Sequence, residues 1–455
     1  MIYYRSAVVL VLLLAAPAAI GARPLTLEEC IQRALRHNVD VHVAEQAVAR
    51  SVADVKAARA DRLPSIDATL LNINRSRTGP SVRIQENPTG EVDTATGQRI
   101  FREEKTLIPA IDRNSYALST SANYTIYDAG RRRNARQASQ SNLENSELGL
   151  RSRRSEVVTG IKRLYFELLK AIELVEVQVE AVHLSEKQLE DAQVRLEVGS
   201  GTKVDVLRLQ VALDNAHSQL INAEQGVILA KAQLNHRMGA EVTAPLEVAE
   251  LGQDEWQVTA GQDSLPALVE KAMRDNPNAR GMAVAVVASE FDLQATRAAW
   301  YPRLGGNLSY SRNNEVFDRI VQDLDQNYRL NLGLNLTYNI FDGGIRQANI
   351  DRARATLETA RMNAEQQRRD LALAIQIERL ELTRLHKLSR LGERTVKLAE
   401  EDLRLAEERY RVGKARLLEV LDAQVGLTEA RGNLVRTRYD LKIAEAELLR
   451  LTGSA

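Results

Sequence analysis

The sequence predicts a mainly helical chain that also contains amphipathic strands and repeats one structural plan twice. Between Tyr328 and Ile340, every even position is apolar and every odd position is polar or Gly. This period of two places the apolar side chains on one face of a strand. The segments 110–244 and 303–455 contain no proline, as expected where long helices occupy most of a segment. Several motifs recur at a constant offset of 214 positions, which indicates an internal duplication.

The N-terminus predicts export. Arg5 precedes a short apolar run over 7–20, and small residues follow it, so residues 1–22 are interpreted as a signal peptide. The run is shorter than the roughly twenty residues that a membrane-spanning helix needs. A single cysteine, Cys30, excludes an internal disulfide. Lys plus Arg equals Asp plus Glu at 61 each, so no nucleic-acid partner is predicted.

Each copy is expected to run helix, strand, strand, long helical hairpin. The first repeat, 23–245, has strands expected at about 65–74 and 115–127 and a hairpin over about 130–238 with its tip near 199. A linker over 246–262 leads to the second repeat, 263–455, with strands at about 302–312 and 328–341 and a hairpin over about 344–452 with its tip near 413.

The helix that opens each repeat is expected to continue to a proline, Pro64 in the first copy and Pro302 in the second. These prolines are 238 positions apart, whereas Gly199 and Gly413 are 214 apart, so the first copy carries 24 extra residues. We expect the extra residues in the polar, Pro- and Gly-containing stretch from about Arg77 to Arg113. The alternation of the first strand also slips between Leu70 and Leu71, which is consistent with a β-bulge.

The hairpins show coiled-coil patterning. Apolar residues on the returning helix of the first copy are spaced 4-3-4-3, beginning Leu209, Leu213, Ala216 and Leu220. The outgoing helix of the second copy has two apolar stripes, and a helix with two seams needs a neighbour on each side. This pattern favours a curved wall of helices that could close into a tube, and a bundle helix with one broad buried face is the alternative. Asp342, after the last strand, is a suitable N-cap for the outgoing helix.

The strands predict a membrane surface. A lipid-facing sheet cannot leave its edges unpaired, and the smallest membrane barrels have about eight strands. Two strands per repeat give four per chain, so several copies must combine if the strands insert. The predicted lipid-facing residues are Leu330, Leu332, Leu334 and Leu336. A long strand of a soluble sandwich is the alternative.

With these features the chain resembles the TolC family of outer-membrane efflux proteins over essentially its whole mature length. The resemblance rests on the duplicated plan and on two matching turns, Arg195-Leu196-Glu197-Val198-Gly199 before Asp205-Val206-Leu207 and Arg409-Tyr410-Arg411-Val412-Gly413 before Glu419-Val420-Leu421-Asp422. It implies a homotrimer in the outer membrane of a Gram-negative-type envelope, with a 12-stranded β-barrel on a long periplasmic α-helical barrel. It also implies an exit duct for efflux or type I secretion, served by a periplasmic adaptor and an inner-membrane pump or secretion ATPase.

The resemblance also assigns residues. It implies a pore constriction at Asp205, Tyr410, Glu419 and Asp422, with the last two as an acidic pair on one helix face, although the family usually has Asp at the position of Glu419. It implies adaptor contacts at the hairpin tips, at Arg195, Gly199, Lys203, Arg409 and Gly413. The alternative for the acids is a solvated helix face, and for Arg195 and Arg409 it is a surface ion pair.

Enzyme chemistry is not predicted. The six histidines show no H-E-x-x-H or other zinc spacing, and no G-x-S-x-G motif is present. The segment 199–203 lacks the spacing of a phosphate-binding loop. We therefore expect no catalytic site, metal or cofactor. A passive outer-membrane duct is the leading interpretation, and a soluble periplasmic coiled-coil scaffold and an exported enzyme are the alternatives.

Overall fold

The computed structural model describes residues 23–252, 256, 263–322 and 325–454. The expected signal peptide and most of the second half of the expected linker lie outside these residues. The chain forms two compact units. The helical unit contains the described residues of 1–49, 145–283 and 363–455, and the strand unit contains 50–144 and 284–362. Each unit therefore takes segments from both repeats.

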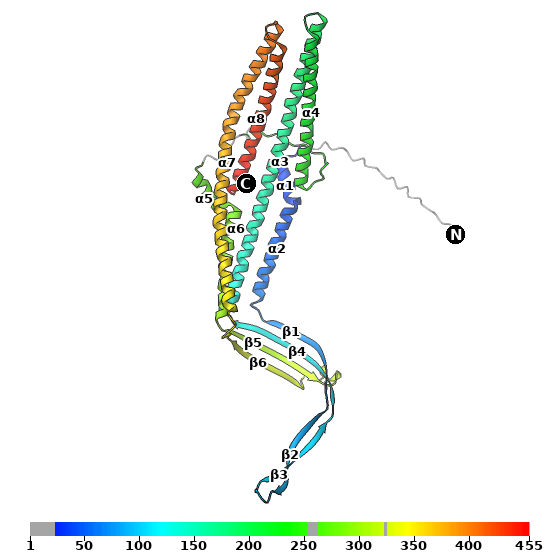
Figure 1. The fold of residues 1–455 in the computed structure, drawn as a ribbon, viewed down its shortest axis with the longest axis vertical. Helices are drawn as coiled ribbons and strands as arrows, with labels where there is room; N and C mark the ends of the chain where they lie inside the picture. Colours follow the sequence, from blue (N-terminus) through cyan, green and yellow to red (C-terminus); the bar gives the residue numbers. More distant parts are fainter. Residues whose placement is uncertain (1–22, 253–255, 257–262, 323–324, 455) are drawn as a thin grey trace, which may run out of the picture. The chain divides into compact units, whose positions relative to one another are not determined.

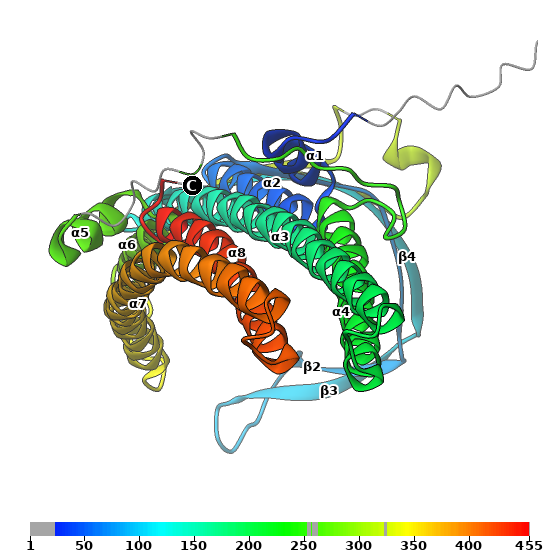
Figure 2. The same cartoon turned by 90° about the horizontal axis from the view of Figure 1, so that it is seen from above.

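The helical unit is built on two helical hairpins. Its helices are α1 (Leu27–His37), α3 (Arg131–Glu197), α4 (Lys203–Met238), α5 (Leu265–Asp275), α7 (Ile345–Arg411) and α8 (Leu417–Leu451), of which α3 and α7 begin in the strand unit. Figure 2 shows α4, α3, α8 and α7 following one another in a curved row. None of the described helices is apolar enough over a sufficient length to cross a bilayer.

The buried core of the helical unit joins helices of both hairpins. In one buried cluster, Ile161 and Tyr165 of α3 pack with Leu234 of α4 and with Val435 and Tyr439 of α8. Helix α3 thus has a neighbour on each side. The two stripes were predicted for α7, where Leu403 shares a buried cluster with Val420 and Leu427 of α8, whereas the other stripe, which contains Leu391, Leu398, Leu405 and Val412, is exposed within the chain. Part of the expected linker also joins this unit, because the backbone N–H of Leu25 donates to the carbonyl oxygen of Glu247 at 2.8 Å.

The helix that opens each repeat is broken, so the prediction of one continuous helix is wrong. Helix α1 ends at His37 and α2 (Val39–Ala60) follows, and α5 ends at Asp275 before α6 (Pro277–Arg297). The intervening residues, Asn38 and Asn276, have extended backbones with ψ of 124° and 121°. Each uses its side chain to hold the end of a distant helix: the Asn38 amide donates to the carbonyl oxygen of Arg237 at 3.3 Å.

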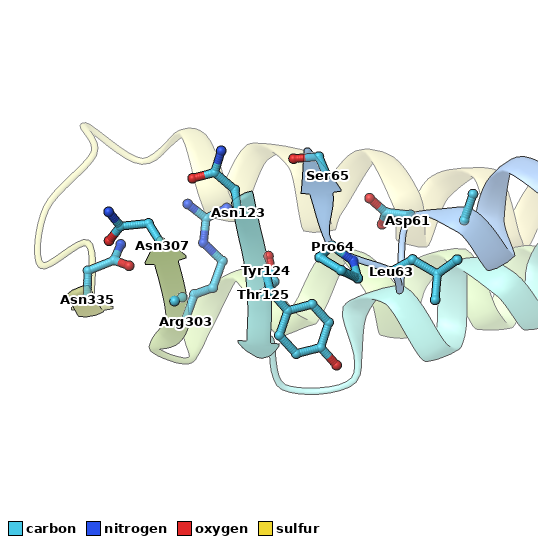
Figure 3. A pocket seen from close by; sticks show the side chains of 13 residues that line it. Asp61, Leu63, Pro64, Ser65, Asn123, Tyr124, Thr125, Arg303, Asn307 and Asn335 are labelled. Atoms are coloured by element: carbon cyan, nitrogen blue, oxygen red, sulfur yellow. The ribbon is translucent and has the colours of Figure 1, made fainter. Parts of the chain in front are cut away.

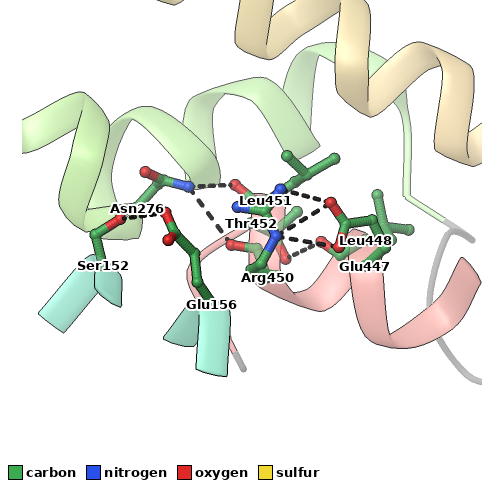
Figure 4. Close-up of polar contacts among 8 residues, drawn as sticks. All are labelled: Ser152, Glu156, Asn276, Glu447, Leu448, Arg450, Leu451 and Thr452. Atoms are coloured by element: carbon green, nitrogen blue, oxygen red, sulfur yellow. Dashed lines mark hydrogen bonds and ion pairs between the residues drawn. The ribbon is translucent and has the colours of Figure 1, made fainter. Parts of the chain in front are cut away.

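The break at Asn276 makes a contact equivalent to the one that Asn38 makes in the first repeat. The Asn276 amide donates to the carbonyl oxygen of Leu451 at 3.0 Å, and Figure 4 shows it directed at the last turn of α8. Gly453 follows that turn with φ of +75°, and a Cβ at this position would lie 2.5 Å from the carbonyl carbon of Asp275. Only glycine fits this close approach between the break and the helix end.

The described residues of the strand unit form six strands, where the sequence predicted four. An antiparallel sheet of β1 (Ser65–Thr78), β4 (Ile111–Tyr127), β5 (Arg303–Asn314) and β6 (Tyr328–Thr337) has the order β1-β4-β5-β6. A separate hairpin, β2 (Ser81–Val92) with β3 (Arg99–Ile108), fills the stretch that we expected to be irregular. Figure 1 shows this hairpin continuing from β1 and β4. Two short 3₁₀ helices, Ala298–Trp300 and Asp318–Ile320, complete the unit.

Two details of the sheet bear on the predictions. The register of β1 against β4 shifts between Thr69 and Asn72, which confirms the irregularity predicted at Leu70 and Leu71. Strand β6 ends at Thr337, earlier than the expected 341. The segment 338–344 instead forms the connection to α7, in which the carboxylate of Asp342 accepts the backbone N–H of Arg346 at 3.2 Å. Asp342 therefore caps the helix start as predicted.

Candidate functional site

The two hairpin tips have the same backbone design. Helix α3 ends in a turn where Gly199 has φ of +75°, and α7 ends where Gly413 has φ of +76°. In the first turn the N–H of Ser200 donates to the carbonyl oxygen of Arg195 at 2.8 Å, and in the second the N–H of Lys414 donates to that of Arg409 at 2.8 Å. The left-handed conformation explains glycine at both positions, and open space surrounds both α-carbons.

Residues from both tips meet within one chain. The guanidinium carbon of Arg195 lies 4.9 Å from the ring centroid of Tyr410, so the two hairpins are joined by a cation–π contact. Burial raises the pKa of the Tyr410 phenol, the negative charge of Asp205 raises it further, and Arg195 opposes both effects. Asp205 itself lies in the first turn of α4, where its N–H donates to the hydroxyl of Thr202 at 3.1 Å.

The acids of the second tip differ in their surroundings. Glu419 lies 3.3 Å from Arg409, and one of its oxygens also accepts the backbone N–H of Arg416 at 3.3 Å. Asp422 is exposed one turn further along α8. Arg409 thus makes the surface ion pair that the sequence left open, and Lys203 is exposed at the first position of α4.

A buried amide beneath the tip was missed by the sequence analysis. Gln424 of α8 donates from its amide to the hydroxyl of Ser185 of α3 at 2.8 Å, and both residues are buried. The signal available in the sequence was a polar residue next to Ala423 in the apolar seam of α8. This contact fixes α8 against α3, with Gln424 five residues after Glu419 and two after Asp422.

One face of the sheet is a broad apolar surface. The leucines Leu330, Leu332, Leu334 and Leu336 of β6 are 60–81% exposed. The cross-strand register places Leu332 opposite Leu308, Leu308 opposite Ala122, and Ala122 opposite Ile66. Apolar side chains therefore cover all four strands on the same face, and a surface of this kind indicates contact with lipid or protein.

The opposite face of the sheet is polar, and its asparagine side chains lie over glycines of the neighbouring strands. Asn335 lies over Gly305 and Asn307 over Gly333, where an added Cβ would come within 2.8 Å and 2.6 Å of the respective amide oxygens. A pocket of about 550 Å³ opens beside them and is also lined by Asn123 and Arg303. Figure 3 shows Asn123, Asn307 and Asn335 projecting from three neighbouring strands.

At the start of each long helix, an ion pair that the sequence analysis did not identify joins the first turn to the connection that precedes it. The carboxylate of Asp128 lies 2.8 Å from Arg132, and that of Asp342 lies 2.8 Å from Arg346. These pairs are 214 positions apart, and all four side chains are largely buried. Asp and Arg four residues apart across a helix start were the signal in the sequence. Arg132 also donates to the carbonyl oxygen of Asp61 at 3.1 Å, which ties the start of α3 to the residues that precede β1.

In the described part of the chain, no three His, Cys, Asp or Glu side chains lie close enough together to hold a metal ion.

The comparisons with known proteins agree with a transport role. The chain is similar to the outer membrane efflux protein BepC of Brucella suis, at 24% identity over 84% of this chain and 82% of that protein. It is also similar to the alkaline protease secretion protein AprF of Pseudomonas aeruginosa, at 24% identity over 79% of this chain and 72% of that one.

A solved structure shows the same fold. The structure of CusC, described in connection with folding and transmembrane channel formation, covers 94% of this chain with a TM-score of 0.80 at 18% identity, and 92% of CusC is matched. The family model of outer membrane efflux proteins matches residues 30–240 and 268–454. Because this match spans most of both repeats, the chain belongs to the outer membrane efflux protein family, and it is an outer-membrane exit duct and not an enzyme.

Proposed function

We propose that three copies of the chain form the duct, with a 12-stranded barrel made from three four-stranded sheets. The single observation that carries this proposal is the sheet itself. Within the described residues, β1 pairs only with β4 and β6 only with β5, so one edge of each outer strand is open. A sheet that faces lipid cannot leave its edges unpaired, and pairing β6 of one copy with β1 of the next satisfies both. The leucine face of β6 then lies against lipid, and the asparagine face lines the lumen.

The α-helical wall continues the duct into the periplasm. Helices α4, α3, α8 and α7 form the curved row expected for one third of a helical barrel, and the hairpin tips lie at its periplasmic end. Asp205, Tyr410, Glu419 and Asp422 form the constriction there. Arg195, Gly199, Lys203, Arg409 and Gly413 present the surface that a periplasmic adaptor contacts.

Transport through such a duct requires an energy source in a partner. Because the family consists of efflux channels and not of enzymes, an inner-membrane pump or a secretion ATPase drives the substrate through the adaptor into the lumen. Relatives named for efflux and for protease secretion leave both kinds of system open. Residues 1–22 act as the export signal, and 246–262 connect the two repeats.

Two neighbouring residues of β6 test the proposal. Leu332 and Asn331 lie on opposite faces of the same strand. Leu332→Lys places a charge against lipid, which costs about 2–4 kcal/mol at the middle of the bilayer, whereas Asn331→Lys places it in the lumen. We expect the first variant to lose outer-membrane insertion and the second to form detergent-stable trimers that conduct ions in planar bilayers. A mature wild-type chain that is monomeric and soluble without detergent would overturn the proposal.

A further inference from the structure

Two pockets of the strand unit occupy equivalent places in the two repeats. The first pocket, of about 280 Å³, is lined by Arg62, Arg133, Arg136, Gln137 and Gln140. The second pocket, of about 290 Å³, is lined by Arg297, Trp300, Tyr301, Gln347, Ile350 and Arg354. Arg62 and Trp300 are related by the offset of 238, and Arg133 and Arg136 correspond to Gln347 and Ile350 by the offset of 214. The duplication thus preserved the cavity while its chemistry changed.

The first pocket holds positive charge without a countercharge. No ion pair is recorded among the described residues for Arg62, Arg133 or Arg136, and the Nε of Arg136 is buried without a hydrogen-bond partner. The acids nearby in the sequence are already engaged, because Asp61 pairs with Arg131 and Asp128 pairs with Arg132. Arg62 and Arg133 are exposed and Arg136 is half-buried. An anion in the pocket could accept hydrogen bonds from all three guanidinium groups, including the buried Nε of Arg136, and would offset their mutual repulsion.

The pocket lies near the end of the sheet where β1 begins and β4 ends, because Arg62 precedes Ser65 by three residues and Arg133 follows Tyr127 by six. Arg132, which is adjacent to the pocket residue Arg133, has its guanidinium 5.8 Å from the ring centroid of Tyr124. Tyr124 is paired with Gly306, and Gly306 with Leu334, so this tyrosine belongs to the leucine face. The equivalent pocket adds Trp300 and Tyr301, which are 45% and 62% exposed. Arginine beside exposed aromatic rings at the limit of an apolar surface is typical of the headgroup level of a bilayer.

We propose that the first pocket binds the phosphate group of a phospholipid from the periplasmic leaflet of the outer membrane. Arg62, Arg133 and Arg136 supply paired N–H donors for the phosphate oxygens, and the two glutamine amides can donate to the glycerol or headgroup oxygens. The bound lipid would anchor the start of α3 at the membrane surface once in each chain. This inference depends on the membrane placement proposed above, but it concerns a site that duct formation itself does not require.

The second repeat supplies a conservative variant for the test. Arg133→Gln with Arg136→Ile introduces the residues found at the equivalent positions of α7, so the helix is expected to tolerate both. Arg151→Gln with Arg153→Gln removes the same two charges further along α3 and serves as the matched control. Arg62→Trp, the residue of the second repeat at that position, is an independent single variant in case the double variant folds poorly.

Purified trimers in detergent would be titrated with short-chain phosphatidylglycerol and followed by native mass spectrometry and thermal unfolding. We expect wild type and control to bind about one lipid per chain, and the double variant and Arg62→Trp to bind at least about fivefold more weakly. Equal lipid binding by all proteins would overturn the proposal. Displacement of the lipid by millimolar inorganic phosphate would also overturn it, because the pocket would then be a general anion site. Channel conductance separates the two proposals, since wild-type trimers that conduct normally but bind no lipid would reject only the lipid site.

Discussion

The guanidinium of Arg195 in α3 lies over the ring of Tyr410 in α7, with 4.9 Å between the guanidinium carbon and the ring centroid. The contact joins the outgoing helices of the two hairpins at their tips, where the proposed constriction lies. An exposed cation–π contact contributes about 0.5–1 kcal/mol. Removing it by Arg195→Ala or Tyr410→Ala should therefore raise the open probability of single channels several-fold, which planar-bilayer recordings can measure.

Tyr410→Phe is the control for that prediction. It keeps the ring that Arg195 contacts and removes only the hydroxyl, so its open probability should stay near that of wild type. If Tyr410→Phe opened the channel as much as Tyr410→Ala, the hydroxyl and not the stacking contact would be responsible. If no variant changed gating, Tyr410 would not belong to the constriction.

The acidic residues of the second tip should set the response to cations. Three chains would bring up to six carboxylates from Glu419 and Asp422 around the axis, and such a ring attracts polyvalent cations. Glu419→Gln with Asp422→Asn should weaken block by cobalt hexammine about tenfold or more, because the ring loses its charge. Glu429→Gln, an exposed acid further along α8, should leave block unchanged. A current–voltage curve that does not respond to the double substitution would exclude these residues.

The stability lost on replacing Gly453 by Ala can be compared with the stability lost on replacing Gly413 by Ala. Its φ of +75° is matched by Gly413 at +76°, but only at Gly453 would a Cβ meet backbone, 2.5 Å from the carbonyl carbon of Asp275. Gly413→Ala should cost about 1–2 kcal/mol from backbone strain alone, and Gly453→Ala should cost more, since the end of α8 must move away from the break at Asn276. Denaturant unfolding measures both, and equal losses would show that the close approach contributes nothing.

The pKa shifts of two glutamates of α7, Glu378 and Glu381, predict opposite effects of pH on the stability of the protein. Burial raises the pKa of Glu378, and the charges of Glu447 and Glu381 add to it against Arg163 and Arg450. Between the ordinary value of 4.5 and the raised pKa, the folded chain binds a proton that the unfolded chain has released. Stability should therefore fall as pH rises through this window, and Glu378→Gln should stabilise the protein at neutral pH but not below pH 4.5.

Glu381 should show the reverse sign. Hydrogen bonds from Arg384 lower its pKa, so its contribution is present above the ordinary value of 4.5 and is lost as pH falls through the lowered value. Glu381→Gln should slightly destabilise the protein at neutral pH and should have no effect in strong acid. Thermal unfolding at pH 4, 5.5 and 7.5 distinguishes the two variants. The same sign for both would show that the environment of Glu378 does not favour its protonated form.

The features that could be predicted from the sequence are those with a strict local period or a special backbone. The alternation around Leu332 predicts the face of β6, and Gly199 and Gly413 predict both tips, because positive φ strongly favours glycine. The capping role of Asp342 was also predicted, and Asp128 occupies the equivalent position of the first repeat. These signals depend on a few neighbouring residues and need no knowledge of tertiary contacts.

The features that were missed depend on tertiary partners or on weak patterns. The break at Asn276 is fixed by the distant carbonyl of Leu451, although Pro277 directly after it is a signal that a helix starts there. The hairpin of β2 and β3 was not predicted because Pro88 and many charged residues interrupt the strand pattern, although Val82 and Ile84 alternate with polar residues in its first strand. The uncompensated arginines of the first pocket could not be recognised at all, because Arg62 and Arg136 are 74 positions apart.

Among the described residues, a hairpin such as β2–β3 occurs in the first repeat and not in the second. Helices and sheet strands come in near-duplicate pairs, so a ring of three chains would otherwise present almost the same features six times around its circumference. In the trimer proposed above, the hairpin would occur three times, so the end of the barrel that carries it would have threefold spacing. A molecule that approaches the proposed duct from outside the cell would meet this coarser spacing first.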